Sequence, residues 1–256
     1  MTTVAPKDGG VQSVLRALEL LEVLAGSAEG IGVNDVAAET GLPQATVHRL
    51  LSTLAGRGFV RQDPVSRKYM LGSKLLRLGE AATRLFQSSV RPYLAELVAI
   101  SGETSNLALL EDGYVVYVAQ VPSLHSMRMF TEVGRRLLPH STAVGKVLLA
   151  FGPRRVAETI ISRHGLPAHT PQTITDPDRF FAELDTVVAH GYAFDEEEQE
   201  AGVCCVAVPV FGIRGPLSAM SVSGPASRLN EARRHDLVSE MMRIAGEISK
   251  SVVNAL

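Results

Sequence analysis

The chain has little cysteine, no long apolar run and no overall positive charge. Its only two cysteines, Cys204 and Cys205, are neighbours. They are too few and too close for a disulfide framework or a four-ligand zinc site, so we expect no metal and no cofactor. No stretch approaches the roughly 18 to 20 uninterrupted apolar residues of a membrane span, and residues 1–10 lack a signal-peptide core. We therefore expect a cytoplasmic protein without membrane contact.

The net charge of −2 excludes a generally basic nucleic-acid coat, but the charge is unevenly distributed. Residues 1–42 carry two basic and six acidic residues, a balance of −4. Residues 43–72 carry five basic residues against Asp63 alone, a balance of +4. Positive charge therefore collects in one short segment, where the phosphates of a nucleic acid would lie.

This basic segment overlaps a pattern of two helices joined by a tight turn. Asn34 is suited to cap a first helix that ends at Thr40, Gly41 can take the positive φ that ends it, and Pro43 suits the start of the next helix. Four apolar residues of the second helix recur at helical spacing and are expected to be buried: Val47, Leu50, Leu51 and Leu54. The outward-facing residues are candidates for contact with base edges and phosphates in the major groove: Gln44, Ala45, Thr46, His48, Arg49 and Ser52.

Helix-turn-helix pairs with polar outer faces also occur in proteins that never contact DNA, so the next segment matters. Phe59–Gln62 and Arg67–Leu71 alternate around the turn Asp63–Ser66, which predicts a β-hairpin. We interpret this hairpin as a wing whose Arg67 and Lys68 contact DNA phosphates. A solvated hairpin alone would not require the local positive charge, so DNA binding is favoured and residues 1–72 form a winged helix-turn-helix domain.

The remaining length is sufficient for a second domain. Residues 73–100 have the pattern of a nearly continuous helix with an apolar stripe from Leu75 to Leu97. Pro92 should kink or divide this helix, which gives a linker helix over 73–90 and a second domain over 91–256. The stripe can pack on its own domain or pair with a second subunit. We favour a dimer, because a two-fold protein doubles its contacts on a palindromic site.

The second domain has a mixed α+β pattern. Strands are expected at Asn106–Leu110, Tyr114–Val121, Met127–Thr131, Val203–Phe211 and Leu217–Val222. Helices are expected at Thr142–Phe151, Arg154–His164, Pro177–His190 and Asn230–Val253. Hairpins with helices on one side leave a concave surface of the kind that holds small ligands.

A ligand site is predicted from one strand face and one helix end. Period two places Ser221 and Ser223 on one face of a strand, and Cys205 lies beside them if the neighbouring strand pairs there. The helix that starts near Thr142 offers the backbone N–H groups of Ala143 and Val144 to an anion such as a carboxylate. The alternatives are that the two serines face solvent and that Ser141 or Thr142 only caps the helix.

The segment Arg135–Ala150 resembles the signature of IclR-type transcriptional regulators. Three other segments agree in order and spacing along nearly the whole chain: Val11–Leu21, Asp195–Pro209 and Ser221–Pro225. The resemblance implies a winged helix-turn-helix, a linker helix and a GAF-like effector-binding domain, assembled as homodimers or homotetramers that control catabolic operons. The acid-binding residues that it implies are Met129, Ala143, Val144, Asp195, Cys205, Ser221 and Ser223.

Asp195 and the apolar wall Met129 enter this set through the resemblance alone. Some members have a smaller Gly-Ala pair where this chain has Ala143 and Val144, which leaves the size of the ligand open. Within the acidic run Asp195–Glu200, only Asp195 is expected to face the pocket, and the rest is expected to be a solvated turn.

The sequence therefore predicts an effector-responsive regulator of transcription. Its partners are double-stranded operator DNA, a small organic acid and further copies of the chain, and repression relieved by the acid is the favoured sign. The alternatives are an activator of the same architecture, an architectural DNA binder without effector, and a thiol-based redox sensor or enzyme that uses Cys204 and Cys205.

Other enzyme motifs are incomplete. Gly145-Lys146 resembles the end of a P-loop, but His140 and Val147 stand where a glycine and a hydroxyl residue are needed, and Ser221 occupies the glycine position of a nucleophile elbow. We therefore expect no enzyme.

Overall fold

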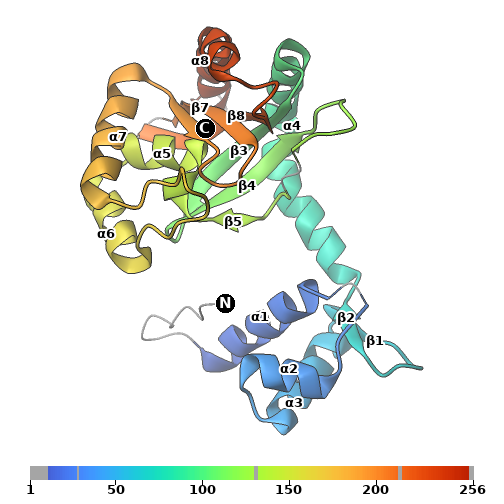
Figure 1. The fold of residues 1–256 in the computed structure, drawn as a ribbon. Helices are drawn as coiled ribbons and strands as arrows, with labels where there is room; N and C mark the ends of the chain where they lie inside the picture. The colour runs from blue at the N-terminus through green and yellow to red at the C-terminus, as the bar shows by residue number, and fades with distance from the viewer. Residues whose placement is uncertain (1–10, 28, 130–131, 213–214, 254–256) are drawn as a thin grey trace. The chain divides into compact units, whose positions relative to one another are not determined.

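The structure is a computed structural model that describes residues 11–27, 29–129, 132–212 and 215–253. The chain forms two compact units, Met1–Ala82 and Thr83–Leu256, shown in Figure 1. The first unit contains the start of α4 and these elements: α1 (Gln12–Ala25), α2 (Val33–Thr40), α3 (Gln44–Gly56), β1 (Val60–Gln62) and β2 (Tyr69–Leu71). The predicted helix-turn-helix and hairpin are therefore confirmed.

The core of the first unit follows the predicted periodicity. Val47 and Leu51 of α3 are fully buried with Leu20, Leu24 and Val36 of the two preceding helices. Leu50 and Leu54, which were also expected to be buried, are half-buried at the edge of this core. Gly41 ends α2 with a φ of 65°, as its position before the turn predicts. These contacts fix α2 and α3 against each other and leave the opposite side of α3 open.

The expected cap at Asn34 is wrong. Helix α2 begins at Val33 and its N-cap is Gly32, so Asn34 is the second residue of the helix. The cause is a pair of backbone hydrogen bonds in which Ile31 and Tyr69 exchange N–H and C=O groups at 3.0 and 2.9 Å. This bridge fixes the end of the extended segment at residue 31. The helix therefore starts directly after it, and Asn34 lies inside the first turn.

Helix α4 (Lys74–Ser101) runs through Pro92, so the expected division there is wrong. A proline inside a helix costs about 3 kcal/mol, because it removes a donor and crowds the preceding turn. Val90, Leu94 and Leu97 are buried around it, and burial of each side chain contributes roughly 1.5–3 kcal/mol. Tertiary packing on both sides of Pro92 outweighs the local penalty.

The second unit contains a six-stranded antiparallel sheet in the order β5-β4-β3-β8-β7-β6. Its strands are β3 (Thr104–Glu111), β4 (Tyr114–Val121), β5 (Arg136–Leu137), β6 (Ala193–Glu196), β7 (Val203–Gly212) and β8 (Gly215–Pro225). The expected strand at Met127–Thr131 is not formed over Met127–Met129, and its last two residues lie outside the described residues. Instead β5 pairs with Val115 and Val116 of β4 and occupies that edge, whereas β6 is a strand that the sequence did not predict.

The helices of this unit cover both faces of the sheet, as Figure 1 shows. They are the short 3-10 helix η1 (Pro139–Ser141), α5 (Ala143–Ala150), α6 (Arg154–His164), α7 (Pro177–His190) and α8 (Glu231–Val253). Aliphatic residues of one face, such as Val206, Met220 and Val222, pack against α8 and the second half of α4. Small residues of the other face, such as Ala207 and Ala219, pack against α5. None of the helices in the described part of the chain combines the length and apolar character of a membrane span.

Candidate functional site

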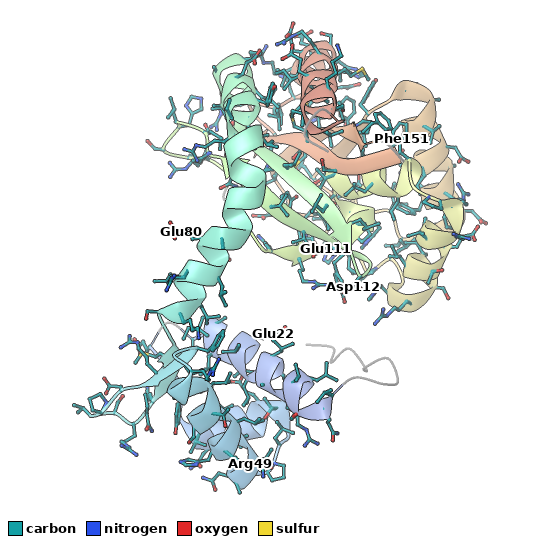
Figure 2. All side chains as sticks on the ribbon, turned by 180° about the vertical axis from the view of Figure 1, so that it is seen from behind. Glu22, Arg49, Glu80, Glu111, Asp112 and Phe151 are labelled. Atoms are coloured by element: carbon teal, nitrogen blue, oxygen red, sulfur yellow. The ribbon has the colours of Figure 1, made fainter. Side chains whose placement is uncertain are left out.

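The outer side of α3 carries the residues predicted to contact DNA. Gln44, Ala45, His48, Arg49 and Ser52 are exposed, while Thr46 is half-buried. Figure 2 shows Arg49 at the outer surface of α3. This pattern follows from the buried residues on the opposite side, and it leaves donors and acceptors on a helix face that fits the major groove.

The wing adds cations to the same unit, because its single acid is occupied within the turn. Asp63 Oδ1 accepts hydrogen bonds from Ser66 N at 2.7 Å, Ser66 Oγ at 2.9 Å and Val65 N at 3.1 Å. The Ser66 backbone hydrogen bond is the main cause that lowers the pKa of Asp63, so this acid caps the turn. Arg67 is exposed and Lys68 is half-buried beside it, which leaves positive charge along the wing.

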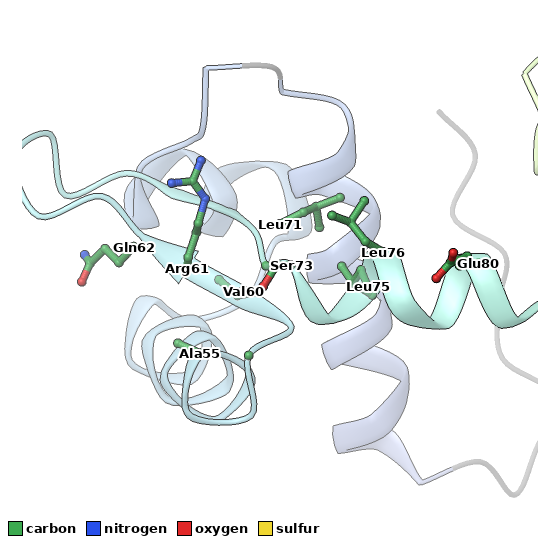
Figure 3. Close-up of a pocket in the computed structure, with 12 residues that line it drawn as sticks. Ala55, Val60, Arg61, Gln62, Leu71, Ser73, Leu75, Leu76 and Glu80 are labelled. Carbon is green, nitrogen blue, oxygen red and sulfur yellow. The ribbon is translucent and has the colours of Figure 1, made fainter.

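A hollow of about 950 Å³ lies within the first unit between the wing and the start of α4, as Figure 3 shows. Its lining is mostly apolar and includes Ala55, Val60, Leu71, Leu75 and Leu76. Leu76 is 75% exposed. This hollow contains none of the predicted acid-binding residues and is a surface feature of the winged unit.

In the second unit, the strand register brings three of the predicted acid-binding residues, Asp195, Cys205 and Ser223, into one row across the sheet. Asp195 of β6 pairs with Cys205 of β7, and Cys205 pairs with Ser223 of β8. Ser223 in turn pairs with Thr104 of β3. Asp195, Ser223 and Thr104 are buried and Cys205 is half-buried. The alternative that the serines face solvent is therefore excluded.

The next row on the same face contains Ala207, Ser221 and Asn106, which pair across β7, β8 and β3. Asn106 Nδ2 donates to Ser223 Oγ at 3.4 Å, and Gln120 Nε2 donates to Asn106 Oδ1 at 3.0 Å. Ser221 Oγ is buried without a hydrogen-bond partner. A buried hydroxyl without a partner costs about 1–3 kcal/mol, so this atom is a strong candidate for a ligand contact.

Asn106, Gln120 and Thr104 were missed by the sequence reasoning. Thr104 and Asn106 stand two residues apart at the start of β3, so they share a face of the strand, and that spacing was the available signal. Their position beside Ser221 and Ser223 depends on pairing between strands more than 100 residues apart, which the sequence alone does not specify.

Helix α5 begins on the same face of the sheet. Thr142 Oγ1 accepts a hydrogen bond from Gly145 N at 3.1 Å, which confirms the capping role predicted for it. The first helical hydrogen bond runs from Lys146 N to Thr142 O, so the N–H groups of Ala143 and Val144 precede the regular ladder. Both residues are only 1% exposed. The helix end and the polar rows therefore offer an anion donors from two elements.

Gly145 explains how closely this helix end approaches the preceding turn. A Cβ atom at residue 145 would lie 2.1 Å from the carbonyl oxygen of Pro139, which is a backbone atom that cannot swing aside. Glycine is therefore required for η1 and α5 to meet. The glycine that resembled part of a P-loop serves packing here.

The buried cation Lys146 organises the acidic turn next to Asp195. Its Nζ donates to Glu183 Oε1 at 3.1 Å, to the Phe194 carbonyl oxygen at 3.0 Å and to Glu198 Oε1. Glu198 is only 5% exposed, so the expectation that the acidic run after Asp195 is solvated is wrong for this residue. The counter-charge explains its burial, because a buried carboxylate is tolerated when it is paired.

The carboxyl group of Asp195 lies at the border of this ion cluster. Its Oδ1 accepts Glu198 N at 2.8 Å and Gln199 N at 3.4 Å. Burial is the main cause that raises the pKa of Asp195 to about 7, and the charge of Glu198 acts in the same direction. A neutral carboxyl group in the row can donate a hydrogen bond to an incoming anion.

Two further predicted positions have clear local environments. Met129 is half-buried, and its carbonyl oxygen accepts a hydrogen bond from Thr104 Oγ1 at 3.1 Å, which places the β4–β5 connection at the end of the polar row. Cys205 Sγ donates to Ser223 Oγ at 3.1 Å.

Burial raises the pKa of both Cys204 and Cys205, which argues against a thiolate nucleophile or sensor at this site. In the described part of the chain, no group of histidine, cysteine and acidic residues is arranged to hold a metal ion.

A winged helix-turn-helix followed by a unit with a buried polar site defines a ligand-responsive DNA-binding regulator. The chain belongs to the IclR family of transcriptional regulators. Residues 13–64 match the IclR helix-turn-helix domain, and residues 83–250 match the bacterial transcriptional regulator IclR C-terminal domain. The family assignment and the α+β winged-helix fold predicted from the sequence are confirmed.

Named relatives agree along nearly the full length. The chain is 36% identical over 242 residues to the HTH-type transcriptional regulator KdgR of Dickeya chrysanthemi, covering 93% of this chain and 79% of the relative. It is 34% identical over 250 residues to the transcriptional repressor IclR of Escherichia coli, covering 96% and 91%. These relatives are regulators, in agreement with the expectation that the chain is not an enzyme.

One similar solved structure contains a bound ligand. The chain is similar to an IclR homolog of Microbacterium hydrocarbonoxydans complexed with 4-hydroxybenzoate, with a TM-score of 0.80 and 25% identity over 95% of this chain and all of that chain.

Proposed function

We propose that this regulator is a repressor that leaves its operator when a small organic acid binds among the polar rows and the start of α5. The observation that carries the proposal is the buried Ser221 hydroxyl, which has no hydrogen-bond partner, shares a row with Asn106 and lies next to the row that contains Ser223. Repression is supported by the relatives that carry the name repressor.

The chemistry of the site favours a carboxylate. The N–H groups of Ala143 and Val144 and the positive end of the α5 dipole attract an anion, and the Ser221 hydroxyl adds a donor. The small side chains of Ala143 and Ala207 leave the surrounding surface apolar, which suits the hydrocarbon part of such an acid. The complex of a relative with 4-hydroxybenzoate is an example of this ligand class.

DNA binding is proposed to use α3 and the wing. Gln44, Ala45, Thr46, His48, Arg49 and Ser52 face the major groove, and Arg67 and Lys68 contact phosphates. Each phosphate contact releases counterions, so affinity should fall steeply with salt.

We propose that the working form is a dimer or a tetramer. Apolar side chains on α1 and at the start of α4 are exposed, with Val14 at 54%, Leu18 at 51% and Leu76 at 75% exposed. A second copy that covers them would remove apolar surface from water and place two recognition helices on a palindromic site. Sedimentation of the purified protein tests this point, and a monomer at micromolar concentration would contradict it.

The main test is a titration of the promoter fragment upstream of the protein's own gene against a panel of keto, hydroxy and aromatic acids, followed by fluorescence anisotropy. One acid should weaken DNA binding about 5- to 150-fold, as a coupling free energy of about 1–3 kcal/mol gives. An acid that strengthens DNA binding would contradict the proposal that the acid releases the repressor from its operator. No preference for this fragment over random DNA, with or without any acid, would contradict the proposal.

Arg49→Ala should weaken binding of the same fragment and reduce its salt dependence by about one counterion per recognition helix. Arg155→Ala is the matched control, because it removes the same charge from an exposed helix position of the other unit. Equal affinities for the two variants would exclude Arg49 from the interface.

A further inference from the structure

The amide of Gln44 is already held by a neighbouring helix. Gln44 is the first residue of α3, and its Nε2 donates a hydrogen bond to Oδ1 of Asn34, which lies in the first turn of α2. Both side chains are exposed. An exposed amide pair competes with water and orders two side chains, so it contributes little to the stability of the fold.

The remaining hydrogen-bonding groups of Gln44 form a defined pair. A glutamine amide has two N–H donors and one oxygen acceptor, and Asn34 uses one donor. One N–H and Oε1 therefore remain for a partner. Adenine presents the complementary set in the major groove, because its N7 accepts and its N6 amino group donates.

We propose that Asn34 is a positioning residue that holds the Gln44 amide so that it reads one adenine in each half-site of the operator. This inference rests on the proposed function, since it assumes that α3 enters the major groove. It adds a second helix to the recognition of bases, and Asn34 was not among the DNA-contacting residues predicted from the sequence.

The position of both residues supports this role. The N-terminal residues of a recognition helix reach base edges most directly, and Gln44 is the first of them in α3. The next residue, Ala45, has only a methyl group, so it leaves the major-groove edge of the base accessible to Gln44. Because Asn34 restricts the rotamers of Gln44 before binding, less side-chain freedom is lost when the base contact forms.

The oxygen of Asn34 is the group that the proposal requires. Its Oδ1 accepts from Gln44, and its own amide N–H groups take no part in that bond. Asn34→Asp keeps the acceptor and removes those donors, while Asn34→Ala removes both. These two substitutions separate the positioning of Gln44 from any direct contact between Asn34 and DNA.

The experiment is selection of bound DNA from a pool of random 30-base-pair duplexes at about 0.15 M salt. The wild type, Asn34→Ala, Asn34→Asp and Gln44→Ala are compared, and Glu39→Gln serves as a control at another exposed position of α2. Thermal unfolding of each variant verifies that its winged unit is folded.

The wild type and Glu39→Gln should select the same motif, with one adenine in each half-site that Gln44→Ala no longer selects. Preference for that adenine should fall about ten-fold in Gln44→Ala, as expected for loss of a bidentate contact. Asn34→Ala should weaken the preference at the same position and leave the others unchanged. Asn34→Asp should retain it, even though the added negative charge lowers overall affinity.

The outcomes distinguish the inference from the function beneath it. A wild-type motif that Gln44→Ala leaves unaltered overturns the reading of adenine by Gln44. A motif altered by Gln44→Ala but unaltered by Asn34→Ala overturns the positioning role. If the wild type enriches no motif at all, the proposed operator binding itself fails.

Discussion

Protonation of Asp195 should control how tightly the acid binds. In the proposed site, the effector anion would approach the carboxyl group of Asp195, which is 2% exposed and whose pKa burial raises to about 7. The titratable groups around it are Glu198 in the adjoining turn, Lys146 on α5, the buried Tyr117 and the half-buried Cys205. An ionised Asp195 repels the carboxylate, whereas the protonated form donates a hydrogen bond to it.

The size of the effect follows from the protonated fraction of Asp195. With a pKa of about 7, this fraction falls from roughly nine-tenths at pH 6 to roughly one-tenth at pH 8. The apparent Kd varies inversely with the competent fraction, so the acid should bind about ten-fold more weakly at pH 8 than at pH 6. The ligand itself does not titrate here, because carboxylic acids ionise near pH 4.

Isothermal titration of the acid identified in the panel, at pH 6, 7 and 8, measures this dependence directly. Asp195→Asn should bind with nearly the same Kd at each pH, because its amide stays neutral. Asp178→Asn, at an exposed position of α7, should keep the wild-type dependence. A wild-type Kd that is constant over this range, or a slope that persists in Asp195→Asn, would refute the reasoning.

The same shift determines the sign of a stability change. The pKa of Asp195 in the folded chain lies above its ordinary value of 3.8, so its contribution is fully present below about pH 4 and is lost as the pH rises through about 7. As the pH rises from 5 to 8, the free energy of unfolding of the wild type should therefore fall relative to that of Asp195→Asn, by an amount on the order of a few kcal/mol. Chemical denaturation at both pH values measures it.

Three further predictions concern neighbouring residues. Ser221→Ala should weaken acid binding about ten-fold, as measured by titration. Its free energy of unfolding should stay the same or rise by about 1 kcal/mol, because an unpaired buried hydroxyl is removed. Ser162→Ala is the exposed control, and equal acid affinities of the two variants would exclude a ligand contact by Ser221. Lys146→Met should lower stability by about 3–5 kcal/mol in denaturant unfolding at neutral pH, because Glu198 loses its counter-charge, and an unchanged midpoint would contradict this. Cys205→Ser should keep the acid response in the DNA-binding assay. Peroxide should leave the wild type active, because burial raises the pKa of the Cys205 thiol. If peroxide inactivates the wild type but not Cys205→Ser, the redox alternative is supported instead.

Local patterns predicted the winged helix well. The burial of Val47 and Leu51, the positive φ of Gly41 and the hairpin around Asp63 all depend on residues close in sequence. The sheet of the second unit was predicted less completely. The four residues of β6 are too few to show an alternation, and their strand conformation depends on pairing with β7.

The residues of the proposed acid-binding site were predicted as separate pieces. The alternation of Ser221 and Ser223 and the cap at Thr142 are local signals. The burial of Glu198 is not, because its partner Lys146 lies 52 residues away and an acidic run by itself suggests solvent exposure. Pro92 shows the same limit, since a local rule against proline was overcome by packing that only the folded chain contains.

The two faces of the sheet have different roles, and this difference affects which substitutions the chain tolerates. In β7, Val206 and Val208 support the aliphatic core while the alternate residues Cys205 and Ala207 point to the other side. In the proposed site, substitutions at Cys205 and Ala207 would change the surroundings of the bound acid and the packing beneath α5, while the aliphatic core on the α8 side of the sheet keeps its residues. A library restricted to such alternate positions is therefore a practical route to sensors for new compounds.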